Sequence, residues 1–155
     1  MPAPRKVSKP IQMHPIGYVR NDVKEPKHDG WDEVESEIVL DAVAPEALDG
    51  IEEYSHIQAI FWMDRVTAEQ RRVWKVHPRG RQDLPLVGVF ATRTPHRPNP
   101  MGLTTVELLE RRGSTLRVKG LDALDGTAVL DIKPPSPKHD LKEVRFPEWV
   151  KRLQG

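Results

Sequence analysis

The abundance of proline is the feature of this sequence that most constrains its fold. The chain has 15 prolines and 10 glycines in 155 residues, and proline lacks the backbone N–H that the interior of a helix or a central strand requires. The composition therefore favours short strands joined by fixed turns over a helical bundle. A chain of this length is expected to form one domain around a single core.

Seven segments have the β-branched and partly alternating composition of strands: 13–20, 33–40, 56–64, 86–92, 104–112, 115–122 and 127–133. The nearly continuous apolar run at 56–64 is typical of a strand buried on both faces. Pro45 and Gly50 suit the start and end of one short helix within 44–56. The tail after 134 is expected to end in a second short helix or a draped strand.

Closing an antiparallel sheet on itself removes its exposed edges. The sequence therefore predicts a mainly β fold, a small closed antiparallel β-barrel with one or two short helices. Residues 11–155 are expected to form this single domain. Residues 1–10 are basic, contain proline and lack periodicity, which predicts a disordered arm.

Composition also limits the function classes. Cysteine is absent and the six histidines are scattered without metal-ligand spacing, so we expect no disulfide and no metal site. No apolar run reaches the roughly 18 residues that span a bilayer, and no signal peptide is recognisable. Lys and Arg number 24 against 23 Asp and Glu. We therefore expect a cytoplasmic protein without membrane segments, whose basic surface arises only from local clustering.

The segment FATRTPHRPNP carries the most specific candidates for binding. Pro95, Pro98 and Pro100 stiffen this loop before any ligand binds, which lowers the ordering cost of binding. Arg93 and Arg97 are held on it, and guanidinium groups suit carboxylates, phosphates and purine faces. The alternative is a barrel corner whose arginines cap backbone carbonyls. We assign no catalytic residue in this loop.

Three further segments have competing interpretations. Asp64 ends the apolar run at 56–64 and Arg65 follows it, and the two side chains could serve a site or form a surface ion pair. Asp122 and Asp125 could accept hydrogen bonds from a ligand or simply form a turn. A basic excursion follows residue 65, and it suits either phosphate binding or a solvated loop; its candidate cations are Arg71, Arg72, Lys75, Arg79 and Arg81.

Four segments together resemble a known family. They are GYVRNDVKEP, EEYSHIQAIFWMD, GVFATRTPHRPNPMGLTTVELL and DALDGTAVLDIKP, and they are similar to the TsaA-like (YaeB, TrmO-type) family of S-adenosylmethionine-dependent tRNA methyltransferases. The similarity runs from about residue 16 to residue 134. It implies a compact β-barrel and a homodimer with the cofactor beside the subunit interface. It also implies methyl transfer to N6 of N6-threonylcarbamoyladenosine, next to the anticodon of tRNA.

The resemblance implies a set of site residues. The cofactor positions are Asp64, Arg65, Arg93, Leu103, Asp122, Ala123, Leu124 and Asp125. Arg97, Trp31 and Lys133 are candidates for substrate binding. The chain departs from the family where VKEPKHDGWDEVES replaces a Phe-Gly-x-Pro-Arg-Gln-like segment, and where IKPPSPKHD replaces an Ile-Lys-Pro-Tyr continuation. Because of these departures, the sequence supports binding of the cofactor better than it supports tRNA as the methyl acceptor.

Three hypotheses follow. The first is a methyltransferase using S-adenosylmethionine, acting on modified tRNA or on another small or RNA acceptor. The second is a module that binds S-adenosylmethionine without catalysis. The third is an RNA-binding barrel without cofactor that uses the basic excursion.

Overall fold

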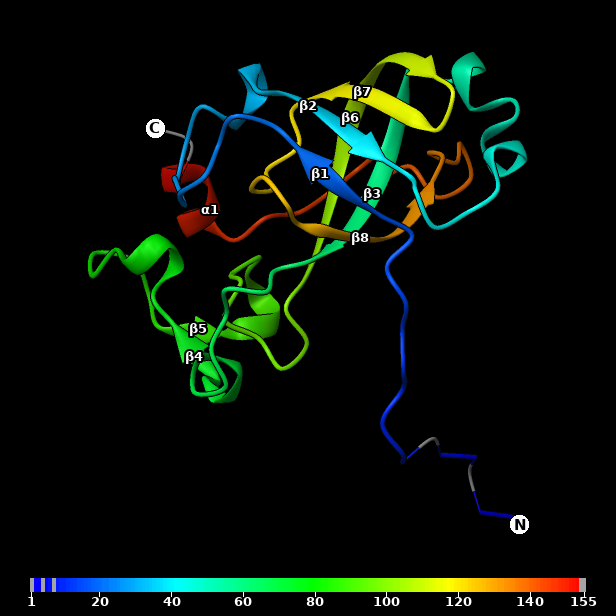
Figure 1. Cartoon of the computed structure of the whole chain (residues 1–155). Helices are drawn as coiled ribbons and strands as arrows, with labels where there is room; N and C mark the ends of the chain where they lie inside the picture. Colours follow the sequence, from blue (N-terminus) through cyan, green and yellow to red (C-terminus); the bar gives the residue numbers. More distant parts are fainter. Residues whose placement is uncertain (1, 4, 7, 154–155) are drawn as a thin grey trace.

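The structure is a computed structural model that describes residues 2–3, 5–6 and 8–153. Positions 1, 4 and 7 of the expected arm, and positions 154–155 of the expected domain, lie outside the described residues. The described residues before position 17 contain neither helix nor strand. Figure 1 shows this N-terminal segment extending away from the rest of the chain.

In the part of the chain that the structure describes, six strands close into a barrel (Figure 1). They are β1 (Gly17–Arg20), β2 (Glu35–Val39), β3 (His56–Trp62), β6 (Met101–Arg112), β7 (Thr115–Lys119) and β8 (Ala128–Lys133). Their order around the barrel is β1-β2-β7-β6-β3-β8, and every neighbouring pair is antiparallel. The predicted mainly β fold with a closed antiparallel barrel is confirmed.

The barrel interior forms the core, and it is built by alternate residues of each strand. In β3 the side chains of Ile57, Ala59 and Phe61 are buried, whereas the residues between them are partly exposed. The prediction that 56–64 is buried on both faces is therefore wrong. Burial on both faces requires a covering layer outside the sheet, and the outer face of β3 is only partly covered.

Gly102 lets β6 pass close to a core side chain. Its register partner on β3 is Phe61, and a Cβ atom at position 102 would overlap atoms of the Phe61 ring. The glycine of the sequence Asn-Pro-Met-Gly-Leu is thus required by packing against the neighbouring strand.

Short helical turns connect the strands: η1 (Trp31–Glu33), η2 (Pro45–Leu48), η3 (Ile51–Glu53), η4 (Gln70–Arg72), η5 (Pro78–Gly80) and η6 (Val89–Ala91). The single helix expected within 44–56 is two 3-10 turns instead. Gly50 separates them because its φ of 90° is left-handed and interrupts the helical path.

The excursion between β3 and β6 forms a small unit outside the barrel. β4 (Lys75–Val76) pairs there with β5 (Val87–Gly88), and the apolar segment expected as a strand at 86–92 turns into η6 after Gly88. The only α-helix among the described residues, α1 (Glu148–Leu153), lies near the loop of the excursion that joins β4 to β5 (Figure 1). Guanidinium groups of the excursion bind its C-terminal end, with Arg79 donating to the carbonyl of Leu153 over 3.2 Å.

Candidate functional site

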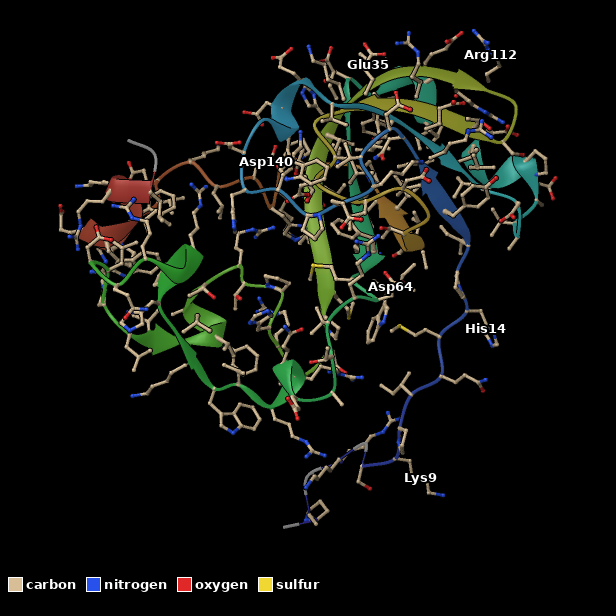
Figure 2. All side chains as sticks on the ribbon, turned by 60° about the vertical axis from the view of Figure 1, so that its left-hand side comes forward. Lys9, His14, Glu35, Asp64, Arg112 and Asp140 are labelled. Carbon is tan, nitrogen blue, oxygen red and sulfur yellow. The ribbon has the colours of Figure 1, made fainter. Side chains whose placement is uncertain are left out.

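Three segments that carry predicted site residues meet at one end of the barrel. Trp62, the last residue of β3, pairs with Met101 at the start of β6 and with Ala128 at the start of β8. The backbone N–H of Met63 also donates to the carbonyl of Pro100 over 2.8 Å. Because β3 lies between β6 and β8, the residues after β3 and those before β6 and β8 share this end. Figure 2 shows Asp64 there, far from Arg112 at the other end of β6.

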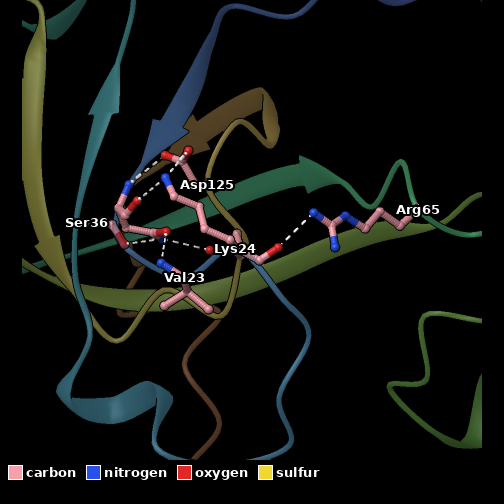
Figure 3. Close-up of polar contacts among 7 residues, drawn as sticks. Val23, Lys24, Ser36, Arg65 and Asp125 are labelled. Carbon is pink, nitrogen blue, oxygen red and sulfur yellow. Dashed lines mark hydrogen bonds and ion pairs between the residues drawn. The ribbon is translucent and has the colours of Figure 1, made fainter.

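The turn before β8 is tied to the loop that follows β1 (Figure 3). One carboxylate oxygen of Asp125 accepts the backbone N–H of Asn21 over 3.0 Å, and the other accepts from the Lys24 ammonium over 2.6 Å. The Asn21 side-chain amide donates to the carbonyl of Ala123 and to the hydroxyl of Ser36, each over 2.9 Å. These contacts fix the shape of the 122–125 turn, in which Leu124 is half-buried.

The charge of Asp125 is stabilised by this arrangement. The hydrogen bond from Lys24 and that from the Asn21 backbone hold the pKa of the Asp125 carboxyl below its usual value. Asp125 is therefore ionised at neutral pH and already occupied by two donors. Its observed contacts hold the loop after β1 in place.

Arg65 connects the end of β3 to the same loop. It donates to the carbonyl of Lys24 over 2.8 Å and pairs with Glu25 over 3.2 Å. The proposed surface ion pair thus exists, but Glu25 rather than Asp64 is its acidic partner. Asp64 is exposed beside it. The loop after β1, the end of β3 and the 122–125 turn consequently form one connected surface.

Two further contacts connect the proline-rich loop and β6 to that surface. The Arg93 guanidinium donates to the backbone carbonyl of Leu103, and the Thr104 hydroxyl donates to the Asp122 carboxylate. The Leu103 side chain remains 45% exposed. Arg93, Leu103 and Asp122, to which the resemblance assigns cofactor binding, therefore lie on neighbouring segments at this end of the barrel. Thr104 was not predicted, because a threonine within a strand gives no sequence signal for binding.

The proline-rich loop is held by local hydrogen bonds as well as by its prolines. The Thr92 hydroxyl accepts the backbone N–H of Thr94 over 3.1 Å, and the Thr94 hydroxyl accepts that of His96 over 3.3 Å. Arg97 donates to the carbonyls of Thr92 and Thr94 over 3.3 and 2.9 Å. Arg97 therefore does cap backbone carbonyls, and so does Arg93. The stiffness predicted from the prolines has this additional source.

A groove of about 1050 Å³ opens beside this loop, between the β4–β5 ribbon and α1. Arg93 and Arg97 line it, together with Phe90 from η6 and Trp149 from α1. Neither aromatic residue was predicted as a site residue. Phe90 lies in a segment expected to be a strand, and the position of Trp149 depends on how the tail returns to the excursion.

Two predicted substrate residues, Trp31 and Lys133, do not line this groove. The Trp31 indole donates to the carbonyl of Lys27 over 3.1 Å, and the Lys27 ammonium lies 4.9 Å from the centre of its ring. Lys133 pairs with Asp131 over 3.2 Å, at the end of β8 remote from Ala128. Neither side chain contacts the predicted cofactor residues among the described contacts.

Several cations of the excursion have structural partners. Arg71 donates to the carbonyl of Pro98 over 2.7 Å and is half-buried. Arg81 donates to the carbonyl of Arg152 over 3.0 Å and pairs with Asp83 over 2.7 Å. These two side chains are therefore held by partners within the protein, and the two interpretations of the excursion stay open for its other cations.

The described residues provide neither a metal-ligand cluster nor a membrane-spanning helix. No three His, Asp or Glu side chains in this part of the chain cluster as metal ligands. No helix in it has both the length and the apolar character needed to cross a bilayer.

Residues 20–141 match the family model of the tRNA-methyltransferase O N-terminal domain. A relative from Methanothermobacter thermautotrophicus, named as a probable S-adenosyl-L-methionine-binding protein, is 45% identical over 128 residues, which cover 80% of this chain and 89% of the relative. A relative of the same name from Archaeoglobus fulgidus is 43% identical over 136 residues, covering 84% of this chain.

The crystal structure of TrmO from P. aeruginosa is similar in fold, with a TM-score of 0.72 and 29% identity over 94% of this chain. The present chain is shorter than some of these proteins. It spans 64% of the crystallised TrmO chain and 35% of the Archaeoglobus relative.

Proposed function

This chain belongs to the family of tRNA-methyltransferase O N-terminal domains, and from that premise we propose that it binds S-adenosylmethionine and transfers its methyl group. The proposed acceptor is N6 of N6-threonylcarbamoyladenosine, next to the anticodon of tRNA. The observation that carries the proposal is a pair of neighbouring contacts at one end of the barrel. Arg93 donates to the carbonyl of Leu103, and the hydroxyl of the next residue, Thr104, donates to the Asp122 carboxylate.

The chemistry of these side chains fits the parts of the cofactor. A guanidinium such as that of Arg93 or Arg65 suits the cofactor carboxylate. The exposed carboxylate of Asp122 suits the ribose hydroxyls or the cofactor cations, and the exposed Leu103 side chain suits the adenine ring. Asp64 and the 123–125 backbone complete the proposed site.

The protein's part in catalysis is mainly positional. When bound, S-adenosylmethionine supplies a methyl group that its sulfonium has already activated for transfer. The proline-rich loop and the 122–125 turn are held by hydrogen bonds within the protein, so their binding groups are already in position before the cofactor binds. Such positioning lowers a reaction barrier by several kcal/mol. The loop after β1 is held beside the site by its contacts with Arg65 and Asp125.

A second candidate function is binding of S-adenosylmethionine without transfer. The Methanothermobacter relative, of which the chain covers 89%, is named for binding rather than for catalysis. This observation favours a binding module.

We also propose that the chain acts in the cytoplasm as a homodimer, with the cofactor beside the interface. Met101 is 39% exposed at the start of β6, next to the proposed cofactor residues, and a second copy of the chain would cover it. Equilibrium sedimentation tests this proposal, and a monomer at micromolar concentration would contradict it.

Methyl transfer is tested by incubating the protein with S-adenosylmethionine and tRNA, followed by mass spectrometry of the nucleosides. The control tRNA lacks the threonylcarbamoyl group. A methyl gain on the modified adenosine alone supports the proposed reaction. Cofactor binding without transfer to either tRNA favours the binding module.

A further inference from the structure

The groove between the β4–β5 ribbon, the proline-rich loop and α1 has a positively charged lining. Its cationic lining residues are Lys75, Arg79, Arg93 and Arg97, and none of the described residues that line it is Asp or Glu. The whole chain has nearly equal numbers of basic and acidic residues, so the excess of positive charge in the groove is a local feature. A groove of this kind favours an anionic partner.

Aromatic side chains line the same groove. Phe90 is 74% exposed and Phe146 is 56% exposed, and Trp149 of α1 also lines the groove. The Arg97 guanidinium lies 5.8 Å from the centre of the Phe90 ring. Exposed aromatic rings beside guanidinium groups are typical of surfaces on which unpaired bases stack.

The side of the groove formed by α1 is hydrogen-bonded to the loop between β4 and β5. Arg79 and Arg81 donate to the carbonyls of Leu153 and Arg152 over 3.2 and 3.0 Å, and Arg152 donates to the carbonyl of Asp83 over 3.4 Å. This side of the groove lies beyond residues 20–141, which the family model matches. The groove therefore depends on a C-terminal segment outside the matched domain.

We propose that this groove binds an unpaired nucleotide segment of RNA, with Phe90 and Trp149 contacting a base and Lys75 and Arg97 contacting phosphates. An acidic peptide would satisfy the cations, but it would leave the aromatic rings without a flat partner. The inference rests on the proposed function, because Arg93 lines the groove and also binds the carbonyl of Leu103. The groove would thus bring the acceptor beside the cofactor residues.

The test measures binding of a fluorescein-labelled RNA hairpin with an unpaired loop to the full chain, by fluorescence anisotropy. A fully paired duplex of the same stem is the reference ligand. We expect the hairpin to bind more tightly than the duplex. Phe90→Ala and Trp149→Ala should each weaken hairpin binding about tenfold or more, whereas Phe90→Tyr should retain it.

Trp74→Ala is the matched control, because Trp74 is 65% exposed on the same excursion but does not line the groove. It should bind the hairpin like the wild type. Wild-type affinity in both Phe90→Ala and Trp149→Ala would overturn the proposal. Displacement of the hairpin by a poly-glutamate peptide at equal concentration would overturn it in favour of an acidic protein partner.

Titration of the same proteins with S-adenosylmethionine separates this inference from the proposed function. Loss of RNA affinity with unchanged cofactor affinity in Phe90→Ala supports the groove. Failure of the wild type to bind the cofactor would contradict the proposed function, while the hairpin measurements would still decide whether the groove binds RNA.

Discussion

The Arg71 Nε atom donates a hydrogen bond of 2.7 Å to the carbonyl oxygen of Pro98, across 27 residues of chain. The same guanidinium lies 5.5 Å from the centre of the ring of Trp62, the last residue of β3. One half-buried side chain therefore joins the excursion, the proline-rich loop and a barrel strand. Arg71 is thus part of the support for the loop that carries Arg93.

Replacing Arg71 should loosen this junction. We expect Arg71→Ala to lower the free energy of unfolding by about 1–2 kcal/mol, because a charge-assisted hydrogen bond and a cation–π contact are lost. Urea unfolding measures the change. Arg72→Ala is the control, since Arg72 is exposed in the same turn. Equal stability of the two variants would show that Arg71 does not support the loop.

The contact between Lys24 and Asp125 predicts a dependence of stability on pH. The pKa of the Asp125 carboxyl is lowered by Lys24 first and by the Asn21 backbone second. The ionised carboxylate therefore stabilises the folded chain above its ordinary pKa, and this contribution disappears as pH falls through the lowered pKa.

The measurement is the thermal midpoint of the wild type and of Asp125→Asn between pH 7 and pH 3. The wild type should be more stable at pH 7, and the difference should shrink below about pH 4. Asp140→Asn, at an exposed position, should match the wild type throughout. A difference that is constant over this range would refute the role of the ionised carboxylate.

Gly102 should tolerate no side chain. In Gly102→Ala the new methyl group would overlap the Phe61 ring, and we expect a loss of about 1–3 kcal/mol in the free energy of unfolding. Gly88→Ala is the control, because Gly88 has an extended backbone with φ of −63° and its nearest neighbour to a new Cβ lies at 3.9 Å. Chemical denaturation compares the two, and an unchanged Gly102→Ala would disprove the overlap.

Much of the barrel could be predicted from local sequence because alternating apolar residues determine which face of a strand is buried. The strand segments around β1, β2, β6, β7 and β8 were found in this way. The prediction of a strand over 86–92 is wrong, because its apolar residues form part of the short β4–β5 ribbon and the 3-10 turn η6 rather than a barrel strand. Apolar content alone does not distinguish these structures.

The candidate site depended more on resemblance than on local pattern. Nothing in the composition of the 122–125 turn predicts that Asp125 binds Lys24, 101 residues away. The packing of α1 against the excursion is equally remote in sequence, because Arg79 and Leu153 are 74 residues apart. Such long-range contacts depend on the topology of the folded chain, which residue spacing does not encode.

The most direct test of the account is calorimetric titration of wild-type protein and Arg93→Ala with S-adenosylmethionine and its demethylated product, at two salt concentrations. We predict saturable wild-type binding that is nearly independent of salt. Arg93→Ala should remain folded and bind about tenfold or more weakly, since a charged hydrogen-bond donor is lost. Arg112→Ala, 82% exposed at the other end of β6, should bind like the wild type. Absence of wild-type binding up to millimolar ligand would contradict the account and leave the proline-rich loop as a structural corner of the barrel.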